Sequence, residues 1–495
     1  MKNISKFILT SLALVLLLTL SGCTSILQPK IYTSINASSF PSTEADAMSA
    51  LIPFYAQFNT NWGSTNPSTG IYESSFNVAY LGYGWATSIQ TDEDFDEWYS
   101  GYSTFTLGPS SYLNTNGACF YNRLSYVAKL TALISEINAS HIPNKDIYIA
   151  EAKGLRAYFM YILWDLYGPL NPRLDPATVN SLEINPRLSE AAYVAAMDSD
   201  LEAAIAVLPT KYNGTTNWGR ISKGVASMIL LKVYMEEAGK TKDASYWTKA
   251  YAVGKSLMTM GYSLDPSYKD VFVTPQNNEV IYAVPGNTTT PQYWYSMIIP
   301  FDAKTVLGQD VTHNQNWKGS EMPWSFYDKY QPGDTRLQTI ASYYINAQGD
   351  TIDRAHGLDG AIPIKYTNIV LNNYGFDLVI FQYSDVLLSM AEITNELYGP
   401  TPEAIGYLKQ VTDRAHTIIP ASATVSHDAL SNFILDERGR ELYWLPGIRR
   451  QDLIRHGTFI SDAVARGLPA KPYQTLWPIP SDVIIQSNGV IIQNC

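Results

Sequence analysis

The sequence has few of the residues that carry covalent or metal chemistry. It contains three cysteines, at positions 23, 119 and 495, and six histidines in 495 residues. So few cysteines do not make a disulfide framework. No histidine lies at helical spacing from another histidine or from a cysteine, which is the arrangement that a zinc site on a helix needs. We therefore expect neither a metal nor a cofactor.

Charge is sparse as well. Asp, Glu, Lys and Arg together make up 16% of the chain, and the formal net charge is −11. Nucleic-acid binding depends on clustered positive charge that neutralises phosphates. An acidic chain with so few basic residues excludes nucleic acid as the expected partner.

One long apolar run is present, and it lies at the start of the sequence. Lys2 and Lys6 precede an apolar stretch over residues 7–20 that is too short to span a bilayer comfortably. The stretch leads into Leu-Ser-Gly-Cys at 20–23, which resembles a bacterial lipobox; an ordinary secretory signal with an incidental cysteine is the alternative. We expect residues 1–22 to be a signal peptide and Cys23 to be lipidated, so that acyl chains hold the protein on a membrane. The mature chain would carry a net charge of −13, from 32 basic and 45 acidic residues.

Aromatic residues, by contrast, are abundant. The chain contains 35 Tyr, 16 Phe and 11 Trp, or 13% of all residues. Some must fill the large apolar interior of a chain of this length. The surplus of Tyr and Trp also suits ligands with apolar faces and hydroxyl rims, because one end of each ring is apolar and the other can hydrogen-bond. Carbohydrates fit this description.

Apolar periodicity predicts paired helices. Over residues 146–166 the apolar side chains recur at alternating spacings of three and four, with Asn144 as the expected cap and Gly168-Pro169 as the stop. Similar patterns predict helical pairs at about 120–168, 189–260, 383–416 and 430–456. Such pairs are typical of tetratricopeptide-like stacking, in which each pair buries its apolar face against its neighbours.

Two long irregular regions, at about 59–115 and 262–380, separate these helical blocks. They are rich in Gly, Asn and aromatic residues and contain short β-like stretches such as residues 279–285. Loops on a rigid scaffold often carry binding residues. Because no break in composition divides the chain, we predict one domain over residues 23–495. Its fold class is mainly α, with tetratricopeptide-like helical pairs as a scaffold, long irregular loops and a few short β-strands.

Several segments, in order along the chain, resemble motifs of the SusD/RagB family. They are LRAYF and DLYGP within 155–169, WGRISK at 218–223, YSDVLL and AE within 383–392 followed by Arg414-Ala415, DERGRELYWLPGIRRQDLIRHG at 436–457, and PIP and QN within 478–494. The sequence departs from the family pattern at Gln382, where an arginine is usual, and at Leu445-Pro446-Gly447. It also has no acidic export tag directly after Cys23.

The resemblance implies a nutrient-binding lipoprotein of the Bacteroidetes outer membrane that faces the extracellular side and catalyses no reaction. Such proteins capture oligosaccharides for a partner TonB-dependent (SusC-like) transporter, with the helical pairs toward the transporter and the loops on the ligand. Alternatives are a peptide-binding importer subunit of the RagB type, a scaffold for a protein partner, and a surface glycoside hydrolase.

Residues 436–457 hold five arginines and four carboxylates in 22 positions. Glu437 and Glu441 are four residues apart and share a helical face, and a glycosidase needs two carboxylates. Neighbouring arginines, however, lower a carboxyl pKa, whereas a general acid needs a raised one. We interpret the segment as a structural ion-pair cluster, with an anion-binding surface and a catalytic site as alternatives. The cluster consists of Glu437, Arg438, Glu441, Arg449, Asp452 and Arg455.

Asp92, Asp94 and Asp96 have the alternate spacing of a calcium-binding loop. Such a loop also needs a glycine at its sixth position and a glutamate at its twelfth. Those positions hold Glu97 and Ser103. We therefore expect a solvated acidic face here.

Aromatic and amide residues in the irregular regions are the candidate ligand residues. The C–H face of a sugar stacks on an indole ring, and neighbouring amides hydrogen-bond its hydroxyl groups. Trp164, Trp218 and Trp247 are expected in the helical core. The predicted ligand-binding residues are Trp85, Trp98, Tyr99, Trp294, Tyr295, Asn314, Asn316, Trp317 and Trp324.

Overall fold

A computed structural model describes residues 40–58, 64–65, 72–73, 83–96, 100–111, 120–212, 214, 216–286, 298–312, 316–366 and 376–494. The predicted signal peptide and Cys23 lie outside these residues. Within the described ranges, no helix combines the length and the apolar character that a membrane span requires.

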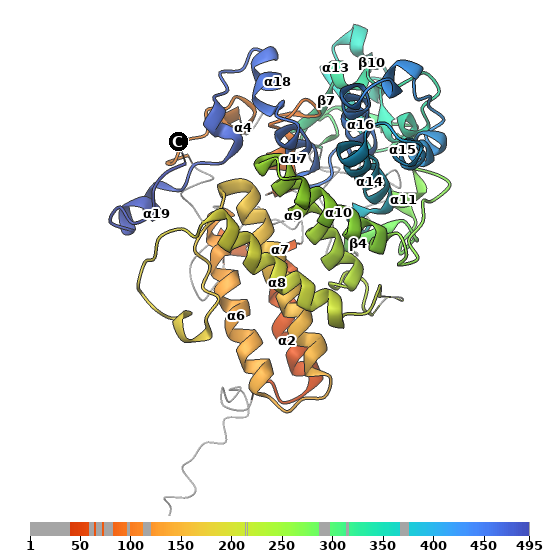
Figure 1. Cartoon of the computed structure of the whole chain (residues 1–495). Coiled ribbons are helices and arrows are strands. Elements are labelled where there is room, and N and C mark those ends of the chain that lie inside the picture. Colours follow the sequence, from red (N-terminus) through yellow and green to blue (C-terminus); the bar gives the residue numbers. More distant parts are fainter. Residues whose placement is uncertain are drawn as a thin grey trace, which may run out of the picture.

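Most of the described chain is helical, and the longer helices form one stack. Their order in the stack follows the chain, with α6 on α7, α7 on α8, α8 on α9 and α9 on α10; α14 then packs on α10, and both α15 and α16 pack on α14. Figure 1 shows the stack running from the orange helices to the blue ones. The predicted fold class is therefore confirmed. The helices of the stack are α6 (Leu124–Ala139), α7 (Lys145–Tyr167), α8 (Glu190–Val207), α9 (Lys223–Thr241), α10 (Ala244–Leu257), α14 (Tyr383–Tyr398), α15 (Pro402–Arg414) and α16 (His427–Leu442).

Side-chain caps account for where several of these helices begin. The hydroxyl groups of Ser189, Ser222, Thr401 and Ser426 each accept a hydrogen bond from a backbone N–H in the first turn of the helix that follows. Asn144 is the N-cap residue of α7, as expected from the sequence. It has a left-handed backbone (φ 50°), however, and its side chain makes no capping hydrogen bond.

Helix α7 is buried far more completely than its sequence pattern predicted. The pattern indicated one apolar face, yet nearly every side chain from Ala150 to Tyr167 is buried, because helices contact α7 on several sides. The charged residues of α7 therefore need partners within the protein. Arg156 meets Asp200 on α8 in two hydrogen bonds of 2.7 and 2.8 Å.

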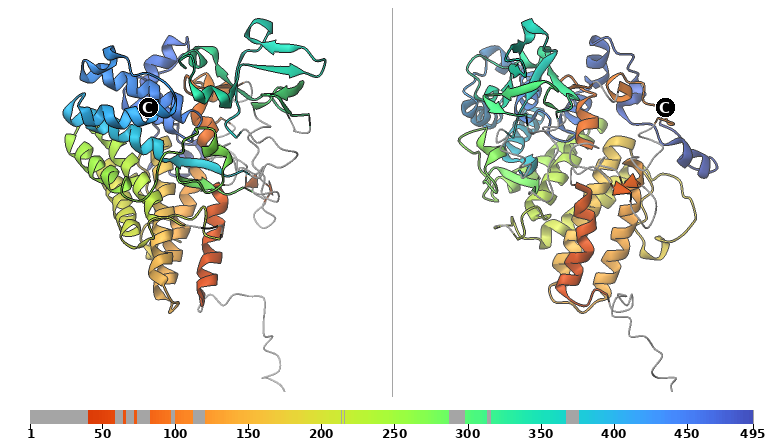
Figure 2. Two further views of the ribbon diagram at one scale, coloured as in Figure 1. Left: turned by 90° about the vertical axis from the view of Figure 1, so that its right-hand side faces the viewer. Right: turned by 180° about the vertical axis from the view of Figure 1, so that it is seen from behind.

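Several of the described strands, β9 and β10 among them, lie on the side of the molecule away from the helical stack, as the left view of Figure 2 shows, whereas the β4–β12 pair contacts α9 and α14 of the stack. One four-stranded sheet has the order β10-β9-β5-β6, a second has the order β3-β7-β11-β8, and β12 pairs with β4. The strands are β1 (Ser64–Thr65), β2 (Tyr72–Glu73), β3 (Phe95–Asp96), β4 (Val280–Val284), β5 (Ala303–Val306), β6 (Gln309–Asp310), β7 (Ser320–Pro323), β8 (Ile340–Ala341), β9 (Tyr343–Asn346), β10 (Thr351–Asp353), β11 (Gly360–Pro363) and β12 (Leu378–Gln382).

The remaining described helices are mostly shorter; among them α2 packs on α6 and α7, and α17 packs on α9 and α16. They are α2 (Glu44–Tyr55), α3 (Tyr83–Ser88), α4 (Ser100–Ser103), α11 (Asp270–Val273), α13 (Trp324–Tyr327), α17 (Ile448–Arg455), α18 (Phe459–Ala465) and α19 (Ser481–Gln486). Single 3₁₀ turns lie at Ala56–Phe58, Phe120–Arg123, Pro176–Thr178, Thr335–Thr339, Arg354–His356, Ala421–Thr424 and Pro472–Thr475.

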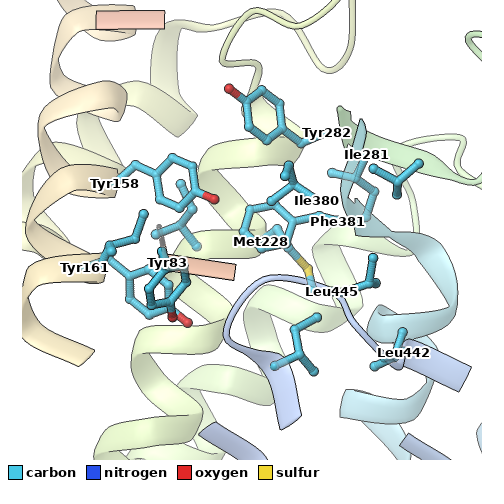
Figure 3. Packing of buried hydrophobic residues seen from close by; sticks show 14 of the residues in the cluster. Tyr83, Tyr158, Tyr161, Met228, Ile281, Tyr282, Ile380, Phe381, Leu442 and Leu445 are labelled. Carbon is cyan, nitrogen blue, oxygen red and sulfur yellow. The ribbon is translucent and has the colours of Figure 1, made fainter. Parts of the chain in front are cut away.

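One large apolar core joins the helical stack to the strands. It extends from Ala47 in α2 to Ile479 near the C-terminus. Figure 3 shows the region where α7, α9 and the β4–β12 pair meet. There, the ring of Tyr158 packs against Tyr282 at 6.1 Å and against Phe381 at 5.9 Å between ring centroids. The strand side is therefore packed directly onto the scaffold through aromatic contacts.

Candidate functional site

The arginine-rich segment 436–457 covers the end of α16, the turn after it and α17. All six residues of the predicted ion-pair cluster are buried. Arg438 contacts Asp452 at 2.8 Å and Asp385 of α14 at 3.0 Å. These contacts connect α16 to both α14 and α17.

Arg455 lies at the centre of a second group of carboxylates. Its guanidinium contacts Glu392 at 2.6 Å, Glu236 at 2.7 Å and Asp452 at 2.7 Å. Burial by itself would raise the pKa of Glu392 and of Asp452, but the neighbouring arginines outweigh burial and lower both values. These carboxylates are held in the ionised form.

Glu437 and Glu441 surround one buried arginine. Arg336 contacts Glu437 at 2.8 Å and Glu441 at 3.1 Å, and it also pairs with Asp334. Burial would raise the pKa of Glu437, yet Arg336 and Arg440 hold that pKa below its ordinary value. A carboxyl group in this setting cannot serve as a general acid, and no open space separates the pair for a glycosidic bond.

The partner of Arg449 is Asp92, which lies 357 positions earlier in the sequence. Sequence reasoning did not predict this pair. Arg449 donates two hydrogen bonds to Asp92, at 2.7 and 2.8 Å, and Lys329 reaches the same carboxylate at 2.8 Å. Burial would raise the pKa of Asp92, but Arg449 and Lys329 reverse the shift and lower it. The expectation of a solvated acidic face is therefore wrong at Asp92, because a cation covers it on each side.

The next residues, Glu93 and Asp94, are also buried. The Glu93 carboxyl accepts a hydrogen bond from Ser88, and burial raises the pKa of Glu93 to about 8. No group of three or more His, Cys, Asp or Glu side chains in the described ranges has an arrangement that could hold a metal ion.

Trp85 does not have the position that a sugar-stacking residue needs. It is 2% exposed, and its Nε1 donates to the hydroxyl of Ser320 at 2.6 Å. Its prediction as a ligand residue is corrected, because protein covers both faces of the ring. Trp164 and Trp247 are buried as expected.

Trp317 and Trp324 flank strand β7 and are partly exposed. Trp324 is the first residue of α13, and its Nε1 donates to the Leu358 carbonyl at 3.0 Å. Tyr327 meets its ring edge-on at 5.4 Å, and the Arg354 guanidinium lies over the ring at 5.2 Å. Arg354 is more than half exposed. This surface combines an indole ring with an accessible set of N–H donors.

Asn316, next to Trp317, donates to the Val311 carbonyl at 3.3 Å and is partly buried. Asn316 and Trp317 thus precede β7 and Trp324 follows it, so all three belong to one stretch of chain. The other predicted ligand residues lie outside the described residues; they are Trp98, Tyr99, Trp294, Tyr295 and Asn314.

A pocket of about 290 Å³ lies between the end of α2 and the turn at 216–220. Its aromatic lining is formed by Tyr55, Phe58, Trp218 and Tyr282. Trp218 was expected in the core but is only partly buried, and its Nε1 donates to Asp377 at 2.7 Å. Sequence reasoning missed this pocket because its walls come from segments far apart in the chain.

The fold is a helical scaffold of the tetratricopeptide-like class, with partly exposed aromatic side chains such as Trp324 on its strand side. Residues 278–466 match the sequence profile of the SusD family. SusD-like protein P2 of Formosa agariphila is 25% identical over 469 residues, which cover 87% of each chain; SusD-like protein P25 of the same organism is 25% identical over 402 residues, or 70% of this chain and 72% of that one. The chain is thus similar to SusD-like proteins over most of its length.

Solved structures share the fold. Surface glycan-binding protein A from Bacteroides thetaiotaomicron, in complex with laminarihexaose, is similar with a TM-score of 0.72 at 20% identity, over 92% of this chain and all of that chain. The B. fragilis protein NanU is similar with a TM-score of 0.73 at 18% identity, over 94% of this chain and 99% of that one.

Proposed function

We propose that this protein binds oligosaccharides at the cell surface and delivers them to a TonB-dependent outer-membrane transporter, without catalysing a reaction. The observation that carries the proposal is the pair of partly exposed tryptophans, Trp317 and Trp324, on the strand side of a SusD-like fold. An indole ring offers the apolar face on which a sugar ring stacks. The relatives support the ligand class, because one similar structure is a surface glycan-binding protein in complex with a glucan oligosaccharide.

The setting of Glu437 and Glu441, the carboxylate pair that the sequence singles out, favours binding over hydrolysis. Both are buried against Arg336, and Arg336 and Arg440 lower the pKa of Glu437, whereas a general acid needs a raised pKa. The lipid anchor at Cys23, attachment to the outer membrane with the chain facing outward, and the SusC-like partner belong to the proposal through the family.

Glycan binding is tested by calorimetry and affinity electrophoresis with the purified chain. The panel contains laminarihexaose together with plant, host and microbial polysaccharides. We expect at least one glycan to be retained, and we expect Trp324→Ala and Trp317→Ala each to weaken binding by about three- to tenfold, the worth of one lost stacking contact. Tyr398→Ala is the matched control, because Tyr398 is a 61% exposed aromatic residue on the helical side.

Other outcomes would contradict specific parts of the proposal. Shortened glycan products after incubation would establish a hydrolase. Retention of peptides with no retention of any glycan would establish the peptide-binding alternative. Equal affinities for the two tryptophan variants and the wild type would remove Trp317 and Trp324 from the ligand site.

A further inference from the structure

Lys329 lies two residues after the end of α13 and connects this short helix to two parts of the scaffold. Its Nζ lies 2.8 Å from Asp92 and 3.5 Å from Asp436 on α16. The same Nζ lies over the ring of Phe326 in α13, 5.1 Å from the ring centroid. The Lys329 side chain is 32% exposed, so its ammonium group stays partly hydrated while it makes these contacts.

Asp92 would keep its place without Lys329. Arg449 holds both oxygens of Asp92 through two parallel hydrogen bonds, and Arg449 is itself fixed by a bond of 2.9 Å to the Leu435 carbonyl. Bidentate arginine–carboxylate contacts define both position and orientation. Asp92 is therefore a fixed anchor, and Lys329 attaches the end of α13 to it.

At its other end, α13 begins with Trp324. The backbone N–H of Asp328 donates to the Trp324 carbonyl at 2.9 Å. Asp328 also accepts hydrogen bonds from Arg354, the residue whose guanidinium lies over the Trp324 ring. The chain next to Lys329 is thus joined both to the backbone of Trp324 and to the cation on its ring.

From these contacts we infer that Lys329 is a positioning residue of the ligand surface. Its ammonium group holds α13 against Asp92, and through α13 it sets where the Trp324 indole and the Arg354 guanidinium lie. The role of Trp324 in binding glycan rests on the proposed function, whereas the tie between Lys329 and α13 does not. Lys329 contacts no ligand itself, because its ammonium group points to the scaffold.

Lys240 provides a matched control. Its side chain is also 32% exposed, it pairs with one partly exposed carboxylate, Glu190, at 3.2 Å, and its Nζ lies over an aromatic ring, that of Trp164, at 3.4 Å. Lys240 lies on α9, in the helical stack. Lys329→Met and Lys240→Met therefore remove the same kind of interaction from the two sides of the molecule.

Hydrogen exchange followed by mass spectrometry tests the tie in the full chain. In Lys329→Met we expect the amides of residues 320–328 to exchange about two- to fivefold faster than in the wild type, with α14 and α16 unchanged. We expect Lys240→Met to leave the exchange rates of residues 320–328 unchanged. We expect Lys329→Arg to keep them at the wild-type values because it retains a cation at this position. Unchanged exchange in Lys329→Met, or an increase that α14 shares, would overturn the inference.

Affinity for a retained glycan is the second measurement. We expect Lys329→Met to weaken binding by a factor similar to its effect on exchange, while its thermal unfolding midpoint stays within the range of Lys240→Met. Unchanged glycan affinity alongside faster exchange would overturn the positioning role. If the wild type retains no glycan but residues 320–328 still respond to Lys329→Met, the proposed function fails and the tie between Lys329 and α13 stands.

Discussion

The ion-pair network around α16 and α17 and the surface around α13 use charge differently. In the network, Arg438 of α16 and Arg455 of α17 are buried and each contacts at least two carboxylates. On the strand side, Arg354 and Lys329 are partly exposed and lie against aromatic rings. Buried ion pairs fix geometry because each partner would be costly to leave alone, whereas a pair with an exposed cation contributes less because water screens it. The comparison therefore contrasts a rigid scaffold with a surface whose cations are accessible to solvent.

The largest effect is expected from breaking the scaffold network at Arg455. Arg455→Met removes the cation that contacts Glu392, Glu236 and Asp452, and it leaves Arg438 as the remaining arginine beside Asp452 and Glu392. We expect the free energy of unfolding at pH 7 to fall by about 3–5 kcal/mol, the usual cost of breaking a buried ion pair. Urea denaturation monitored by circular dichroism measures the loss. A loss of less than about 1 kcal/mol would show that the network does not stabilise the stack.

Trp85 sharpens the comparison because it lies in the strand-side region but is buried like a scaffold residue. Trp85→Phe removes the hydrogen bond from Nε1 to Ser320 and leaves a small cavity. We expect a loss of about 1–3 kcal/mol in unfolding free energy. Glycan affinity should stay at the wild-type value when it is measured well below the unfolding temperature, and a specific loss of affinity would return Trp85 to the ligand site.

Glu93 introduces a pH dependence at the boundary between the two sides. Because burial raises the pKa of Glu93 from 4.5 to about 8, the folded state holds a proton between these values that the unfolded state releases. This contribution to stability is therefore complete below pH 4.5 and is lost as the pH rises toward 8. Relative to the wild type, we expect Glu93→Gln to raise the free energy of unfolding by at least about 1 kcal/mol more at pH 8.5 than at pH 5.5. Equal gains in urea denaturation at the two pH values would contradict the raised pKa.

The smallest effect is expected at Lys409, which pairs with Asp413 on the outside of α15. Both side chains are more than half exposed. We expect Lys409→Met to change the unfolding free energy by less than about 0.5 kcal/mol, because water screens such a pair. The same denaturation series gives this value, and a loss close to that of Arg455→Met would remove the distinction between buried and exposed pairs.

The sequence predicts the helices well because their signals are local. Apolar spacing and the stop at Gly168-Pro169 define α7, and the observed bounds, Lys145–Tyr167, differ from the prediction by one residue at each end. The SusD-like motifs identify the fold for the same reason, since each motif is a short continuous stretch. The interpretation of segment 436–457 as ion-paired follows from arginines next to carboxylates in the sequence, and the buried contacts of Arg438 and Arg455 are of that kind.

The candidate site is harder to predict because its contacts join distant segments. Nothing local to Arg449 indicates that its partner is Asp92, and nothing local to Trp85 indicates that Ser320 accepts its N–H. Amino-acid composition also does not distinguish buried from exposed tryptophans in the irregular regions, although Trp85 is buried and Trp324 is partly exposed. Exposure depends on the tertiary packing of several strands, and no periodic pattern in the sequence records it.

The pairing of Asp92 with Arg449 has a consequence for how the chain reaches its final state. The two residues are 357 positions apart, and Trp477 bonds Gln90 across 387 positions. A chain emerging N-terminus first cannot close these contacts until nearly all of it is present, and contacts of such high sequence separation form slowly. Part of the apolar surface of the N-terminal region therefore stays exposed until the C-terminal segment has been synthesised and packs against it. A protein assembled in this order depends on being kept from premature association until its C-terminus is free.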